Sequence, residues 1–191
     1  MKNFAKYIFC FISISLHTKN IKAENIWILD KELSEIKFEL PVLLVEDVNG
    51  QFTKFDGSVL IDLKNKENNR ALFFVNINSM ELNYKKQKGL LLSDIFFDEI
   101  NFPIAIIDTK KFSIPEDSNS LLIDSELQIK DFINVVPLKI KINHLANGWI
   151  NVKANLKFSR KSFELGKNAW SSTMIIKDKI LLKANLFLYK K

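Results

Sequence analysis

The sequence of 191 residues is poor in the residues from which most catalytic and metal sites are built, with one cysteine, two histidines and five glycines. A single cysteine excludes a disulfide framework and a metal site made of several cysteines. The sequence contains no G-x-S-x-G, P-loop or G-x-G-x-x-G motif, which removes the usual signatures of serine hydrolases and nucleotide-binding folds. No apolar run reaches the roughly 18 residues that a membrane-spanning helix needs.

The excess of positive charge is concentrated at the N-terminus. The chain has 28 Lys and Arg against 22 Asp and Glu, a net charge of +6 that would suit an acidic partner such as nucleic acid. Residues 1–23 hold four of these bases and no acid, and their basic start, apolar segment 7–16 and terminal Ala23 are typical of a signal peptide. We therefore predict cleavage near Ala23 and a periplasmic protein of nearly neutral charge. We expect no nucleic acid partner.

Alternation with a period of two dominates the remaining sequence and predicts β-strands. Apolar side chains alternate with polar ones in four segments: 36–40, 121–129, 136–142 and 150–158. Segments 72–77, 104–107 and 175–189 are apolar on both faces in part, which predicts strands covered on both sides. Segment 88–98 is the exception and predicts a short helix. About eight strands with regular turn signals indicate a sandwich or an up-and-down barrel.

Three dipeptides are turn signals, and the histidine and carboxylate patterns offer little for catalysis. Asn49-Gly50, Asp56-Gly57 and Asn147-Gly148 predict turns, although the first two are so close that at least one must be a bend rather than a hairpin. His144, the one histidine after residue 23, precedes a turn, where we expect it in solvent. Adjacent carboxylates occur only in predicted loops. We therefore expect no enzyme, no metal site and no cofactor.

Phenylalanine is abundant, with 16 residues against three Tyr and three Trp. Four segments, in order, carry a resemblance to the YceI-like family of exported, lipocalin-like lipid-binding proteins. They are Trp27-Ile28-Leu29-Asp30 with Ser34 to Phe38; Val48 to Phe52 with Phe55-Asp56-Gly57; Asn78-Ser79-Met80 with Leu92 to Asp98 and Phe102-Pro103; and Phe158 to Phe163 with Leu165-Gly166 and Trp170. Each segment alone is weak evidence, whereas their order and spacing over residues 25–189 are more specific.

The resemblance implies an all-β fold in a domain of residues 24–191: an extended eight-stranded antiparallel, lipocalin-like barrel with one short helix near 88–98. It also implies a long apolar cavity for an isoprenoid or another long amphipathic chain. Candidate residues at the lining or mouth of that cavity are Phe38, Phe52, Phe55, Phe96, Phe97, Phe102 and Phe163. Ordinary core packing is the alternative for each of them.

Arg160 is the candidate polar ligand-binding residue. The chain has only two arginines, so an arginine within an apolar strand suggests a need for planar, bidentate geometry. It could bind a lipid head group, or it could form a partly buried ion pair with Asp30 or Asp178.

The leading hypothesis is an exported, non-enzymatic protein that sequesters or carries an isoprenoid, an isoprenoid quinone or a fatty-acyl compound, with transient membrane contact. One alternative is an accessory module for a membrane electron-transfer protein. A large exposed apolar patch beside a filled, cavity-free barrel would favour that alternative. Another is a lipid-directed hydrolase, which would need two facing carboxylates with perturbed pKa values.

Overall fold

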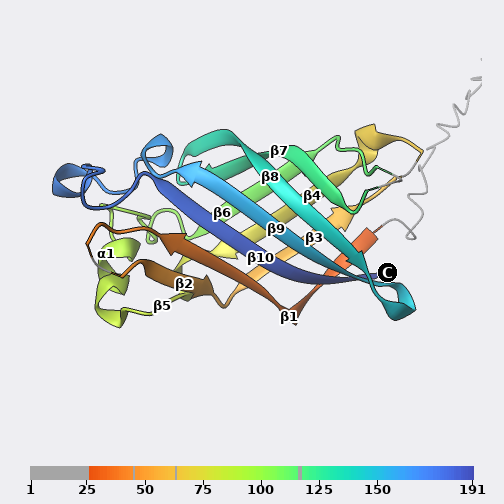
Figure 1. Cartoon of the computed structure of the whole chain (residues 1–191), viewed down its shortest axis with the longest axis horizontal. Coiled ribbons are helices and arrows are strands. Elements are labelled where there is room, and N and C mark those ends of the chain that lie inside the picture. The colour runs from red at the N-terminus through yellow and green to blue at the C-terminus, as the bar shows by residue number, and fades with distance from the viewer. Residues whose placement is uncertain (1–25, 45, 63, 116–117) are drawn as a thin grey trace, which may run out of the picture.

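The computed structural model describes residues 26–44, 46–62, 64–115 and 118–191. The predicted signal peptide and its cleavage near Ala23 lie outside the described residues. Eight antiparallel strands form a closed barrel in which β10 pairs with β1, as Figure 1 shows. The barrel strands are β1 (Ile26–Leu40), β3 (Phe55–Leu60), β4 (Arg70–Asn76), β6 (Ile104–Lys110), β7 (Ser120–Ile129), β8 (Phe132–His144), β9 (Trp149–Ser159) and β10 (Lys179–Lys190). The predicted eight-stranded barrel is confirmed.

Two further strands, β2 (Val48–Phe52) and β5 (Met80–Leu82), extend the sheet at one end of the barrel. This is possible because β1 changes partner along its length: residues 26–28 pair with β3, and residues 36–40 pair with β2. In the pairing of β1 with β10 the register shifts between Asp30 and Glu35. Figure 1 shows β2 and β5 beside α1 (Lys88–Leu92), at the end of the barrel opposite the C-terminal end of β10.

The helix α1 is shorter than the predicted segment 88–98. It ends at Leu92 because Ser93 adopts an extended backbone with ψ of 170°, while the Ser93 hydroxyl donates to the Leu90 carbonyl at 2.7 Å. Short 3-10 turns occupy Lys66–Asn68, Ile77–Ser79, Lys85–Gln87, Ala146–Gly148, Lys161–Phe163 and Asn168–Trp170. In the described part of the chain, no helix is both long enough and apolar enough to cross a membrane.

Two of the three predicted turns are wrong, because Gly50 and Gly57 lie within strands β2 and β3. Both glycines face the barrel interior beneath aromatic rings. A Cβ atom on Gly50 would lie 2.4 Å from the Phe38 ring, and one on Gly57 would lie 2.2 Å from the Phe73 ring. These glycines therefore make room for phenylalanines on neighbouring strands. The third turn, around Asn147, is confirmed between β8 and β9.

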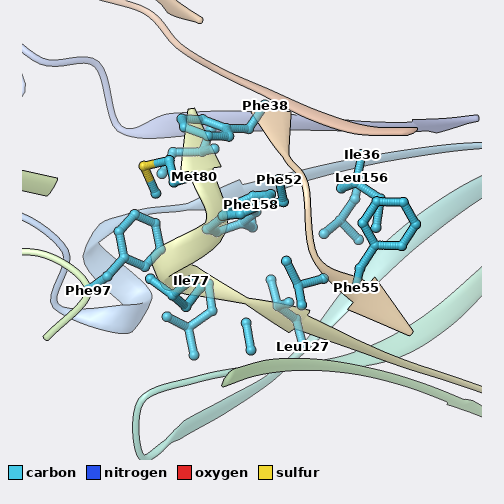
Figure 2. Packing of buried hydrophobic residues seen from close by; sticks show 14 of the residues in the cluster. Ile36, Phe38, Phe52, Phe55, Ile77, Met80, Phe97, Leu127, Leu156 and Phe158 are labelled. Atoms are coloured by element: carbon cyan, nitrogen blue, oxygen red, sulfur yellow. The ribbon is translucent and has the colours of Figure 1, made fainter. Parts of the chain in front are cut away.

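The alternating side chains point as predicted, with apolar residues turned into the barrel. Buried inward rows include Ile36, Phe38 and Leu40 of β1, and Figure 2 shows the packing around them. The expectation that β4 and β6 are covered on both sides is wrong, because Phe74 and Ile104 are 40% and 39% exposed. The sequence of these segments is apolar on both faces, so it does not show that one face lies on the outside of the barrel rather than being buried.

Candidate functional site

The larger of two cavities inside the barrel lies between the inward faces of its strands. It has a volume of about 90 Å³ for the centre of a water-sized molecule. Its wall consists of Ile, Leu, Val and Ala side chains, with Phe73 and Phe112 as the aromatic members. Among the described residues of that wall, Thr109 is the single polar one. An interior of this composition stays dry and accepts an apolar guest.

A smaller cavity continues the larger one toward the end of the barrel that carries α1. Its volume is about 30 Å³ on the same measure, and its wall is entirely apolar, with aromatic side chains from Phe38, Phe52, Phe97 and Phe158. Ile107 and Leu182 line both cavities. These two side chains therefore form the partition of one apolar interior that runs along the barrel.

Three of the seven predicted phenylalanines come together in the smaller cavity. Phe38 and Phe52 are neighbours across β1 and β2, with ring centroids 5.2 Å apart. Phe97 reaches the same space from the segment after α1, as Figure 2 shows. Phe55 belongs to the buried core, outside the walls of both cavities.

The other three phenylalanines lie outside the walls of both cavities. Phe96 is buried, 6.4 Å from Trp170 between ring centroids. Phe163 is fully buried and packs edge-to-face on Phe158 at 5.3 Å, so it supports the cavity wall from behind. Phe102 is half-buried in the turn before β6, where its backbone N–H donates to the Asp98 carbonyl at 2.9 Å.

Arg160 is fully buried directly after β9, and backbone carbonyls surround its guanidinium group. Nε donates to Lys177 at 3.1 Å and Nη1 to Leu165 at 2.8 Å. Nη2 donates to the carbonyls of Ser172 and Ile176 at 2.9 and 3.1 Å, with a longer contact to Ser171 at 3.4 Å. The guanidinium group thus organises the loop between β9 and β10.

No carboxylate forms an ion pair with Arg160 among the described residues, so neither Asp30 nor Asp178 is the partner that the sequence suggested. Asp178 contributes its backbone carbonyl, which accepts from the Arg160 N–H at 2.8 Å, while its side chain accepts from the Ser159 hydroxyl at 2.6 Å. Burial lowers the pKa of Arg160, and the charge of Asp178 partly opposes this effect.

The ionisable groups of the described chain lie outside the walls of the two cavities. On the outer face, Arg70 binds Asp108 through two hydrogen bonds of 3.0 and 2.8 Å, which hold the pKa of that carboxyl below its usual range. The buried Lys130 donates to the Glu164 carbonyl at 3.2 Å, and burial lowers its pKa.

In each of the two described pairs of adjacent carboxylates, one member bonds to a neighbouring polar side chain. Glu46 accepts a hydrogen bond from the Tyr84 hydroxyl, and Asp98 accepts from Asn101. The pair at residues 116 and 117 lies outside the described residues. No cluster of three or more His, Cys, Asp and Glu in the described segments could hold a metal ion.

Sequence reasoning missed most of the larger cavity, because it concentrated on phenylalanine. The wall is mainly aliphatic, as at Ile140, Ile142 and Val152, and Phe73 and Phe112 were not among the candidates. The alternation of segments 136–142 and 150–158 carried the necessary signal, since it already placed these side chains on one face.

Solved structures with the same fold have low sequence identity to this chain. BcnA from Burkholderia cenocepacia has a TM-score of 0.74 and 21% identity, covering 83% of this chain and 98% of its own. A polyisoprenoid binding domain from Saccharophagus degradans, implicated in plant cell wall breakdown, has a TM-score of 0.67 and 14% identity, with coverage of 86% and 98%. The YceI protein of Campylobacter jejuni has a TM-score of 0.68 and 20% identity, covering 79% and 90%.

A search of curated proteins gave no significant match. The family model of the YceI-like domain matches residues 27–188, which include all ten strands except the first residue of β1 and the last two of β10. The match includes the four segments that carried the resemblance. The chain therefore belongs to the YceI-like family.

Proposed function

We propose that this protein binds a long-chain lipid within the barrel and either sequesters or carries it, without catalysing a reaction. The candidate ligands are an isoprenoid, an isoprenoid quinone or a fatty-acyl compound. The observation that carries the proposal is the apolar interior, in which two cavities meet at Ile107 and Leu182 and no charged side chain lines the wall. Transfer of each CH₂ group from water into such an interior gains about 0.8 kcal/mol.

A long chain needs more room than the empty cavities offer, so binding should open the partition between them. Rotation of the Ile107 and Leu182 side chains would join the two spaces without breaking any strand pairing. Phe38, Phe52 and Phe97 would then contact the part of the lipid nearest α1. The likeness to a polyisoprenoid binding domain supports this proposal through the shared fold.

We also propose that the protein is exported to the periplasm and touches a membrane transiently when it exchanges its lipid. Two loops near α1 support the membrane contact. Leu44, Met174 and Ile175 are 93%, 76% and 58% exposed, and the Leu43 N–H donates to the Ile175 carbonyl at 2.8 Å, which holds the two loops together. Exposed aliphatic side chains grouped in this way suit insertion between lipid head groups.

The interior of the barrel does not favour the accessory role. Phe74 and Ile133 belong to an exposed apolar row on the outer face, as that role requires, but the role was also expected with a filled barrel, whereas this interior contains two cavities. The hydrolase role has no support from the described carboxylates, because every Asp or Glu with a shifted pKa is shifted downward.

Lipid uptake by an Ile107→Trp variant tests the proposal. The indole should block the partition, so the variant should take up much less long-chain polyprenol or fatty-acyl lipid than the wild type, measured by mass spectrometry of solvent extracts. Ile106→Trp is the matched control, because Ile106 lines a groove on the outer face of the barrel. Circular dichroism verifies that both variants fold. Wild-type protein that retains no lipid, or equal uptake by both variants, would refute the proposal.

A further inference from the structure

The side-chain hydroxyl of Thr109 has no hydrogen-bond partner among the described residues. It lies near the end of β6, its side chain faces the larger cavity, and the residue is 1% exposed. Its Oγ1 atom is buried and makes no hydrogen bond within the described protein. A buried hydroxyl without a partner costs free energy, so such groups are rare in folded proteins.

A comparison with Ser125 shows that the barrel interior can satisfy a hydroxyl. Ser125 is also 1% exposed, and its position in β7 between Ile123 and Leu127 turns it inward. Its hydroxyl donates to the Val136 carbonyl on the paired strand at 3.2 Å. The two hydroxyls therefore differ: that of Ser125 is bonded to the backbone, whereas that of Thr109 has no partner among the described residues, although Thr109 lines the cavity.

A buried water is a poor partner for the Thr109 hydroxyl. An ordered internal water needs two to four polar partners. Thr109 is the single polar side chain among the described residues of this wall, and on the β4 side its backbone is already paired with Ala71. A ligand with an apolar body and one oxygen atom needs only the one hydrogen bond that Thr109 can supply, so it fits this wall better than a water molecule does.

Hydrogen bonds of Asn69 join two segments at the end of the cavity next to Thr109. Asn69 is 4% exposed, and its side chain donates to the Phe112 carbonyl at 2.7 Å while accepting from the Asp62 N–H at 2.5 Å. Phe112 lines the same cavity as Thr109. The hydroxyl is therefore shielded from solvent on this side, and a ligand oxygen that reaches it is desolvated.

We propose that the ligand is an uncharged lipid whose oxygen-bearing end lies deep in the larger cavity and hydrogen-bonds to the Thr109 hydroxyl. This inference rests on the proposed lipid-binding function. Because no charged side chain lines the cavity, a phosphate or carboxylate there would be uncompensated, which favours a ketone, quinone, ester, amide or alcohol oxygen. The hydrocarbon part then extends past Ile107 toward the phenylalanines of the smaller cavity.

The test compares a long-chain methyl ketone with the alkane of equal chain length, both offered together to the purified protein and quantified by mass spectrometry of the extracted complex. Wild-type protein should bind more ketone than alkane. In Thr109→Val the ratio of bound ketone to bound alkane should fall about five- to tenfold, which corresponds to the loss of one hydrogen bond, while the alkane is still bound. Thr109→Ser should keep the preference. Ser125→Ala is the matched control and should also keep it, because its hydroxyl is already bonded to Val136.

The outcomes separate this inference from the proposed function. Retention of neither compound by the wild type would refute lipid binding itself. Uptake of both with an unchanged ketone preference in Thr109→Val would overturn only the role of Thr109. A second measurement is independent of ligand: removal of an unpaired buried hydroxyl should raise the thermal midpoint of the empty protein. A lower midpoint would show that the protein itself satisfies Oγ1, which also contradicts the inference.

Discussion

Replacement of Arg160 by alanine should destabilise the protein strongly, because the guanidinium group holds the loop between β9 and β10. The change removes hydrogen bonds to the carbonyls of Leu165, Ser172, Ile176 and Lys177. Each buried carbonyl that loses its partner costs about 1–3 kcal/mol, although part of this is offset because the buried charge also disappears. We expect a net loss of about 3–5 kcal/mol in the free energy of unfolding, a large share of the roughly 5–15 kcal/mol of a typical domain.

Urea unfolding monitored by circular dichroism measures this loss. The other arginine of the chain supplies the control: Arg70 is exposed on the outer face, where its ion pair with Asp108 is worth about 1 kcal/mol or less. Arg70→Ala should therefore unfold close to the wild type. An Arg160→Ala variant within about 1 kcal/mol of the wild type would refute the reasoning. If that stable variant also failed to bind lipid, the head-group role of Arg160 would be supported instead.

Three further predictions concern backbone fit, pH and the exposed loops. Gly166→Ala should lower the free energy of unfolding by more than about 1 kcal/mol in a urea titration, because φ is +86° and the added Cβ would lie 2.6 Å from Nη1 of Arg160. Asp108→Asn should destabilise the protein near neutral pH but not at low pH. The hydrogen bonds from Arg70 lower the pKa of Asp108 in the folded protein. Their stabilising effect is therefore complete above the unfolded pKa of about 3.9 and is lost as the pH falls through the folded pKa. Urea titrations at pH 7 and pH 3 should show this convergence, and a constant difference would contradict it. Leu44→Asn should change stability by less than about 0.5 kcal/mol, since Leu44 is 93% exposed at φ of 64°, yet weaken sedimentation with lipid vesicles.

The barrel could be predicted from the sequence because its strands are long and regular. Alternation between polar and apolar residues in β7, β8 and β9 matches the faces that the barrel buries. The glycines of β2 and β3 misled the prediction, since a short-range turn signal cannot reveal that a phenylalanine on another strand requires the space. Long-range packing decided those two positions.

The candidate site was predicted in part, for a related reason. Phe38, Phe52 and Phe97 do line a cavity, but nothing local distinguishes them from Phe55 or Phe163, which pack elsewhere. Whether a phenylalanine lines the cavity or packs in the core depends on which strand lies opposite it, and the local sequence around the residue does not show this. The unpaired hydroxyl of Thr109 could not be predicted for the same reason, since only the folded barrel shows whether a carbonyl lies within hydrogen-bonding distance of it.

The pairing of β1 with β10 sets a condition on how the molecule reaches its native state. Trp27 lies opposite Lys190, so the two strands that complete the cylinder are separated by almost the whole described sequence. Closure of so long a loop is entropically unfavourable, and domains dominated by such distant pairings fold on a timescale of about milliseconds to seconds. Until β10 reaches β1, both strands present unpaired edges. Because the Lys191 N–H donates to the Ile26 carbonyl at 3.0 Å, a circular permutant joined at this point and opened in the turn after β8 would make the closing pair local and should fold faster.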